Sequence, residues 1–148
     1  MGFEIELSDE PTGGVSEIDF EKAEKYYVTV LSERLGLPVS LSFGELRLEE
    51  MRRASARECG LGSEATFGDI ALAMMRDGTL ESVGIPTRGW KEYFTGIVQK
   101  SLGSILCGNP DASWQEIQRA EIVAMIREEL GIPEGQALPL DFMVIRIE

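Results

Sequence analysis

Both ends of the 148-residue chain carry β-strand patterns, and helical patterns fill most of the sequence between them. Near the N-terminus, FEIEL (residues 3–7) alternates apolar residues with two glutamates, which is typical of a strand with one buried face. Near the C-terminus, apolar residues run without a break from Phe142 to Ile145, which indicates a strand covered on both faces. A one-sided strand suits the edge of a sheet, and a two-sided strand suits its centre.

Cap residues and apolar periodicity predict five helices between these strands. Ser16 followed by Asp19 is a variant of the capping box, and Gly36 provides the C-terminal cap of the same helix. Thr66 with Asp69 repeats the box. The predicted helices cover about residues 17–35, 45–59, 67–77, 88–107 (capped by Thr87) and a last segment from Pro110 or Ser113 to Gly131.

Residues 38–43 allow more than one interpretation. VSLSF (residues 39–43) alternates like FEIEL, which favours a strand. Ser42 and Glu45 have capping-box spacing, and Gly44-Glu45 could instead turn a hairpin. Arginines follow Glu49 at four-residue spacing, which only a helix uses. We therefore expect a strand over residues 38–43 followed directly by a helix.

Together these patterns predict an α+β fold in one domain, residues 1–148. We expect a small mixed three-stranded sheet, with strands near residues 3–8, 38–43 and 139–147, packed with about five helices. The C-terminal strand would be central, between two parallel neighbours that a right-handed crossover connects.

The predicted register places Met143, Ile145 and Ile147 in the main core. Val144 and Arg146 then lie on the opposite face, where Arg146 can pair with a glutamate of FEIEL. Leu140, Phe142 and Val144 remain as an apolar strip in a polar frame. Either a helix from residues 45–77 or a partner chain is expected to cover this strip.

The net charge of −12 is concentrated at the two ends of the chain. Residues 1–30 carry net −6 and residues 111–148 net −5, whereas residues 31–110 carry only −1. If the terminal strands are neighbours, these acidic segments meet in one negative surface that would attract a basic protein partner. The residues expected to bind such a partner are Asp9, Glu10, Glu17, Glu21, Leu140, Phe142 and Val144. The alternative interpretation is an ordinary solvated surface.

Composition argues against several other classes of function. The chain contains no histidine, which removes the usual general base, and its two cysteines lack metal-ligand spacing. We therefore expect no metal and no cofactor. The acidic charge has the wrong sign for nucleic acid or an anionic membrane. A helix-turn-helix interpretation of the segment around Gly60 fails because the second helix would open with Phe67, Gly68 and Asp69 instead of basic residues. With no secretion signal visible, a cytoplasmic location is expected.

The sequence thus predicts a non-catalytic, acidic protein-binding module, such as an inhibitor or immunity protein, a chaperone or an assembly component acting on a basic partner. One alternative is a small carboxylate- or Lys-dependent enzyme, with Asp69 and Glu92 as candidate carboxylates. Another is a small-ligand sensor with a closed apolar cavity. A homo-oligomer is compatible with all three.

Overall fold

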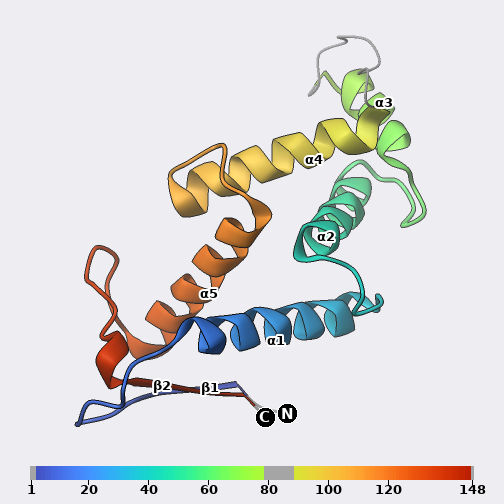
Figure 1. The fold of residues 1–148 in the computed structure, drawn as a ribbon. Coiled ribbons are helices and arrows are strands. Elements are labelled where there is room, and N and C mark those ends of the chain that lie inside the picture. Colours follow the sequence, from blue (N-terminus) through green and yellow to red (C-terminus); the bar gives the residue numbers. More distant parts are fainter. Residues whose placement is uncertain (1–2, 79–88, 148) are drawn as a thin grey trace. The chain divides into compact units, whose positions relative to one another are not determined.

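The computed structural model describes residues 3–78 and 89–147, which form helices and one small sheet. In chain order the elements are β1 (Phe3–Leu7), α1 (Glu17–Leu35), α2 (Phe43–Glu58), α3 (Phe67–Arg76), α4 (Gly89–Leu102), the π-helical turn η1 (Gly103–Cys107), α5 (Trp114–Leu130), the 3-10 turn η2 (Leu140–Phe142) and β2 (Met143–Ile147) (Figure 1). The chain divides into two compact units, one of Met1–Ser40 with Gln115–Glu148 and one of Leu41–Trp114. Thr87, the predicted cap of α4, lies outside the described residues.

The first unit is built on the antiparallel pairing of the two ends of the chain. Phe3 lies opposite Ile147, Ile5 opposite Ile145, and Leu7 opposite Met143. This confirms that the terminal strands are neighbours, and that the apolar positions of both strands share one face. Met143 is 1% exposed and belongs to a core that also contains Ala23, Ile122 and Ile126, with Phe3, Ile5, Phe20, Tyr27, Ile145 and Ile147 packed around it.

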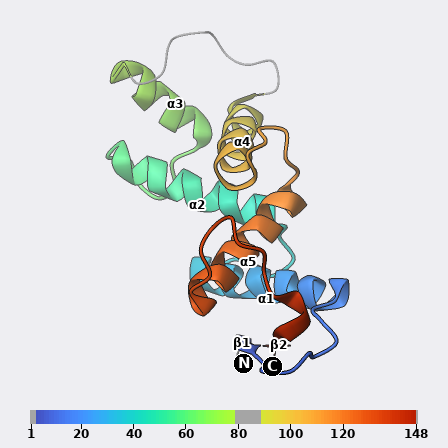
Figure 2. The same cartoon turned by 90° about the vertical axis from the view of Figure 1, so that its left-hand side faces the viewer.

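Helices α1 and α5 supply the rest of this core and lie on the same side of the sheet (Figure 1; Figure 2). The predicted capping box opens α1, because the Ser16 hydroxyl accepts from the Asp19 N–H while the Asp19 carboxylate accepts from the Ser16 N–H. Gly36 ends the helix at φ 66°, a left-handed conformation that glycine adopts without a Cβ penalty. The N-terminal helix is therefore confirmed at both ends.

The second unit packs α2, α3 and α4 around Ala56, Ile70, Ala71 and Phe94. The rings of Phe67 and Phe94 stack with centroids 5.7 Å apart, so these aromatic residues contribute to the packing of this unit. After α4, the chain reverses closely over Gly103, where a Cβ would lie 2.4 Å from the Asn109 carbonyl oxygen. Only glycine permits that close approach.

The predicted strand over residues 38–43 is wrong, and so is the three-stranded sheet with a central C-terminal strand. Ser42 is the N-cap of α2: its hydroxyl accepts from the Glu45 N–H at 3.2 Å, and Glu45 accepts from the Ser42 N–H at 3.3 Å. The cap prevails over the five-residue alternation because it lets Phe43 enter the helix as a buried residue. The described residues, 3–78 and 89–147, contain two strands, so β1 and β2 are both edges there and no crossover joins parallel neighbours among them.

The predicted C-terminal strand is also too long at its beginning. Residues 140–142 form η2 instead, with the Phe142 N–H donating to the Pro139 carbonyl oxygen at 2.9 Å. Pro139 has no N–H to give to a ladder, so a strand can begin only after it. This turn separates Leu140 and Phe142 from the strand positions that follow.

Replacing Ser42 tests why residues 38–43 are not a strand. Ser42→Ala removes the N-cap of α2 and is expected to lower the free energy of unfolding by about 0.5–2 kcal/mol. Urea denaturation measures the change. Ser40→Ala is the matched control, because Ser40 is exposed and precedes the helix. Equal effects of the two substitutions would contradict the importance of the cap.

Candidate functional site

The loop of residues 8–14 is bound to the segment that leads into β2. It turns at Gly13 and Gly14, both with left-handed φ values (89° and 87°), and so returns toward the C-terminal segment. Hydrogen bonds join the two: Ser8 N–H donates to Phe142 O at 2.7 Å, Thr12 N–H to Asp141 O at 2.8 Å, and the Thr12 hydroxyl to Met143 O at 2.9 Å and to Asp141 O at 3.2 Å. Segments about 130 residues apart in sequence are thereby held side by side.

These bonds bring together four of the seven predicted partner-binding residues. Asp9 and Glu10 are exposed on the loop, and Leu140 and Phe142 are 37% and 39% exposed on η2. Asp141, between the last two, is also exposed. We call Asp9, Glu10, Leu140, Asp141 and Phe142 the loop-turn surface: two apolar side chains framed by three carboxylates.

Val144 does not belong to this surface. It lies within the ladder opposite Glu6 and is half-buried, whereas η2 breaks the alternation that would have aligned it with Phe142. Its face of the sheet also carries Arg146, which forms the predicted ion pair with Glu6 at 2.9 Å. Both side chains are about half exposed, 54% for Arg146 and 52% for Glu6, so the pair contributes at most about 1 kcal/mol.

Glu17 has a structural partner in α5. The Arg119 guanidinium lies 2.6 Å from Glu17 and 2.7 Å from Glu24, and it also stacks 4.8 Å above the ring of Phe20. The hydrogen bond from Arg119 lowers the pKa of Glu17, and the hydrogen bonds to the carboxylates raise the pKa of Arg119. Glu17 thus joins α1 to α5 instead of presenting an unpaired charge.

Glu21 lies one turn further along α1 and is exposed. It lines an open depression of about 460 Å³ within the first unit. The other lining residues are Glu24, Lys25, Val28, Thr29, Val39 and Gln118. Lys25 brings a positive charge to this depression, so its charge is mixed and Glu21 is not part of a purely acidic site.

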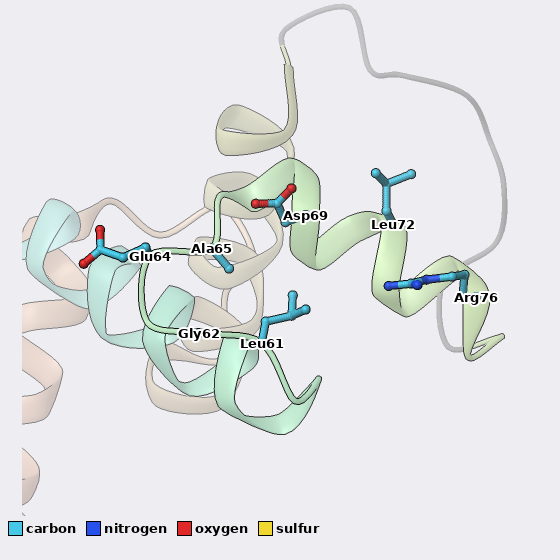
Figure 3. Close-up of a pocket in the computed structure, with 7 residues that line it drawn as sticks. All are labelled: Leu61, Gly62, Glu64, Ala65, Asp69, Leu72 and Arg76. Atoms are coloured by element: carbon cyan, nitrogen blue, oxygen red, sulfur yellow. The ribbon is translucent and has the colours of Figure 1, made fainter.

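The second unit has a larger open depression, of about 690 Å³, between α3 and the loop before it. It is lined by Leu61, Gly62, Glu64, Ala65, Asp69, Leu72 and Arg76, and Figure 3 shows Leu72 and Arg76 projecting from α3. Asp69, one of the two candidate catalytic carboxylates, accepts from the Thr66 N–H at 3.0 Å and therefore acts as a cap. Glu92, the other candidate, is exposed and does not line this depression.

The arginines of α2 bind within their own unit. Arg52 and Arg53 both pair with Glu49, as expected, and Arg52 also donates to the carbonyl oxygens of Ser63 and Ala65 at 2.8 and 2.7 Å. Residues 59–66 separate α2 from α3, whereas a helix-turn-helix uses a turn of about three or four residues. The helix-turn-helix interpretation of this segment therefore fails on geometry as well as on sequence.

Comparisons with known proteins leave the chain without an assigned family. No family model, curated protein or solved structure matches it. In the part of the chain that the structure describes, no group of three Cys, Asp or Glu side chains is placed to hold a metal ion, and no helix is long and apolar enough to cross a membrane. Cys59 and Cys107 are half-buried and are not joined in a disulfide, and Cys59 packs against the core of the second unit.

Sequence reasoning missed the residues that assemble the loop-turn surface. Thr12 and Asp141 supply its central hydrogen bonds, yet neither has a periodic pattern that would mark it. The available signal was local: Thr12 stands between Pro11 and paired glycines, a composition typical of a turn. Which carbonyl groups such a turn would bind depends on the strand pairing, which only the fold reveals.

The Arg119 contacts predict acid sensitivity of the first unit. Because folding lowers the pKa of Glu17 below its ordinary value of 4.5, this carboxylate stabilises the folded state at pH values above 4.5. The stabilisation is lost as the pH falls through the lowered pKa. Urea denaturation should therefore show Glu17→Gln less stable than the parent at pH 7, and this difference should shrink as the pH is lowered below 4.5.

Glu21→Gln is the control for this measurement. It removes the same charge one turn further along α1, from an exposed carboxylate. Arg119 forms its ion pairs with Glu17 and Glu24 instead of with Glu21. We expect a smaller change in stability at pH 7 than for Glu17→Gln. If the stability difference between Glu17→Gln and the parent were as large below pH 4.5 as at pH 7, the pairing of Glu17 with Arg119 would not be its cause.

Proposed function

We propose that this chain is a non-catalytic protein-binding module that binds a basic partner through the loop-turn surface. A toxin that it inhibits, a client that it chaperones and a neighbour in an assembly are all partners of this kind. The observation that carries the proposal is the hydrogen bonding of loop 8–14 to residues 141–143, which keeps acidic and exposed apolar side chains together.

The negative charge of the chain is concentrated in the first unit. The first unit contains sixteen acidic and six basic residues, net −10, whereas the second contains ten and eight, net −2. Arg119 and Arg146 are engaged with carboxylates, and Arg127 donates to the carbonyl oxygens of Pro133 and Gln136. Most acidic residues of this unit are exposed, so its negative charge faces solvent, and a field of this sign raises the association rate of a basic protein.

The loop-turn surface also contains an apolar part. Exposed carboxylates direct encounter but add little affinity once a complex has formed, because water screens them. Burial of apolar side chains supplies the short-range affinity, and aromatic residues are enriched among interface anchors. Leu140 and Phe142 offer that burial between Asp9, Glu10 and Asp141. The surface therefore suits a partner that combines basic and apolar side chains.

The depression of the second unit supports a second candidate, small-ligand binding. Its volume of about 690 Å³ is that of a ligand pocket, and it combines apolar Leu61 and Leu72 with charged Glu64 and Arg76. It is open, however, whereas a sensor is expected to enclose its ligand. An enzyme would need convergent catalytic groups, and Asp69 is occupied as a helix cap. Protein binding is therefore the better-supported function.

Phe142→Asp tests the apolar part of the protein-binding proposal. The probe is a short amphipathic peptide of Lys and Leu, titrated by calorimetry in low-salt and high-salt buffer. Because the substitution adds a negative charge, purely electrostatic binding would strengthen. We expect affinity to fall by about tenfold or more, the effect of losing a buried aromatic contact. The variant should stay folded, since Phe142 is already 39% exposed.

Leu72→Asp is the matched control, because it also replaces an exposed apolar residue by aspartate, but in the other unit. It should leave peptide affinity unchanged. Loss of binding in the control alone would place the interaction at the second-unit depression. Absence of binding by the parent protein, even at low salt, would refute the proposed function.

Asp9→Asn with Glu10→Gln tests the acidic part. Removing two exposed carboxylates should weaken binding of the same peptide at low salt and flatten its salt dependence, because fewer charges attract the lysines. At high salt, the double variant and the parent should bind alike. The control is Glu128→Gln with Glu129→Gln, an exposed acidic pair of α5. Equal effects of the two double variants would mean that only total charge matters.

A further inference from the structure

The β1–β2 ladder determines which backbone groups of β1 point outward. In antiparallel pairing, residues alternate between those bonded to the partner strand and those facing away from it. The bond from Ser8 N–H to Phe142 O sets the phase of this alternation. Glu4 and Glu6 therefore use their N–H and C=O groups toward β2, and Phe3, Ile5 and Leu7 direct theirs away.

The two outer edges of the sheet differ. On β2, the loop covers the start of the edge, where Thr12 donates to the carbonyl oxygens of Asp141 and Met143. On β1, no other strand among residues 3–78 and 89–147 pairs with the outward edge. The edge of β1 therefore offers backbone donors and acceptors over its whole length, a known template for an added strand.

The side chains of β1 decide what kind of strand can be added. Glu4 and Glu6 are exposed on the face of the sheet opposite α1 and α5. If a second copy of this chain paired through β1 in antiparallel fashion, centred on Ile5, each Glu4 would lie opposite a Glu6. Like charges directly opposite destabilise a strand pair, whereas a Lys or Arg at each position stabilises it by about 0.2–1 kcal/mol.

We propose that β1 binds an extended segment of a basic partner as a third, antiparallel strand. This inference rests on the proposed function and specifies how the partner is held. Basic residues at every second position lie beside Glu4 and Glu6, and the residues between them lie beside Phe3, Ile5 and Leu7. Backbone hydrogen bonds to these last three supply affinity, and the alternation supplies specificity. Leu7, 50% exposed, leads directly into the loop-turn surface.

Three peptides separate strand addition from simple charge attraction. The first alternates Lys and Val, the second is the same peptide with N-methyl groups on its valines, and the third has N-methyl groups on its lysines. In the proposed register, the N–H groups of the valines face β1, whereas those of the lysines face away. Methylation of the valines should lower the affinity by about threefold to tenfold for each hydrogen bond lost, and methylation of the lysines should not.

A pair of protein variants tests the same β1 edge by changing the protein instead of the peptide. Leu7→Pro removes the outward N–H of β1 and leaves the ladder bonds of Glu4 and Glu6 intact. Leu7→Ala removes the exposed side chain but keeps the N–H. We expect Leu7→Pro to bind the alternating peptide about threefold to tenfold more weakly than Leu7→Ala. Equal urea denaturation of the two variants verifies that the fold is unchanged. If their stabilities differ, the three peptides are compared on the parent protein instead, and that comparison decides whether a strand is added.

The outcomes distinguish this inference from the proposed function. If neither the alternating Lys-Val peptide nor the Lys-Leu peptide binds at low salt, both are refuted. If only the Lys-Leu peptide binds, the present inference alone is overturned. If all three peptides bind equally, the protein attracts basic partners but does not add a strand, so only the present inference is overturned. If methylation of the lysines is the harmful change, antiparallel addition in this register is overturned.

Discussion

The antiparallel pairing of residues 3–7 with residues 143–147 is the contact on which the arrangement of the first unit depends. It brings the two most acidic segments of the chain together and directs Met143 into the core beneath α1 and α5. It also sets the position at which loop 8–14 meets η2. A two-stranded sheet is marginal by itself, so the helices that cover one of its faces are needed for its stability. These helices leave the other face of the sheet and the outer edge of β1 uncovered.

An acidic unit of this kind must limit repulsion among its own carboxylates. Polar side chains of α5 meet α1 at three places: Arg119 binds Glu17 and Glu24, Gln118 donates to the Glu24 carbonyl oxygen at 2.9 Å, and Glu121 accepts from the Tyr27 hydroxyl at 3.2 Å. Bridging two carboxylates with one guanidinium exploits the planar fork of arginine. The scarce basic residues stabilise the helix pair, and the surplus acids remain at the surface.

Local signals predicted most elements, and failures occurred where two signals overlapped or where distant segments met. Ser16, Ser42 and Thr66 each form the capping box that their spacing indicates. At residues 39–43, alternation and a cap competed, and the cap prevailed because burial of Phe43 rewards the helix.

At the loop-turn surface, too, local patterns could be predicted from the sequence, whereas contacts between distant segments could not. Asp9, Glu10, Leu140 and Phe142 could be grouped once the terminal strands were paired. The partner of Glu17 could not be predicted, because Arg119 is 102 residues away and helix spacing does not identify which turns face each other. The start of β2 was missed for a different reason: a proline whose effect on the following turn depends on tertiary hydrogen bonds.

The combination of exposed apolar and acidic groups has a consequence for partner choice. An exposed Phe142 beside Leu140 would by itself favour contact with any apolar surface, including a second copy of the chain. Two copies meeting through this patch would bring Asp9, Glu10 and Asp141 of both close together, within the screening length of about 8–10 Å at which such charges still repel. A basic partner gains attraction at the same distance. The carboxylates therefore disfavour a second copy of the chain and favour a basic partner. Glu4 and Glu6 of β1 have the same effect at the sheet edge.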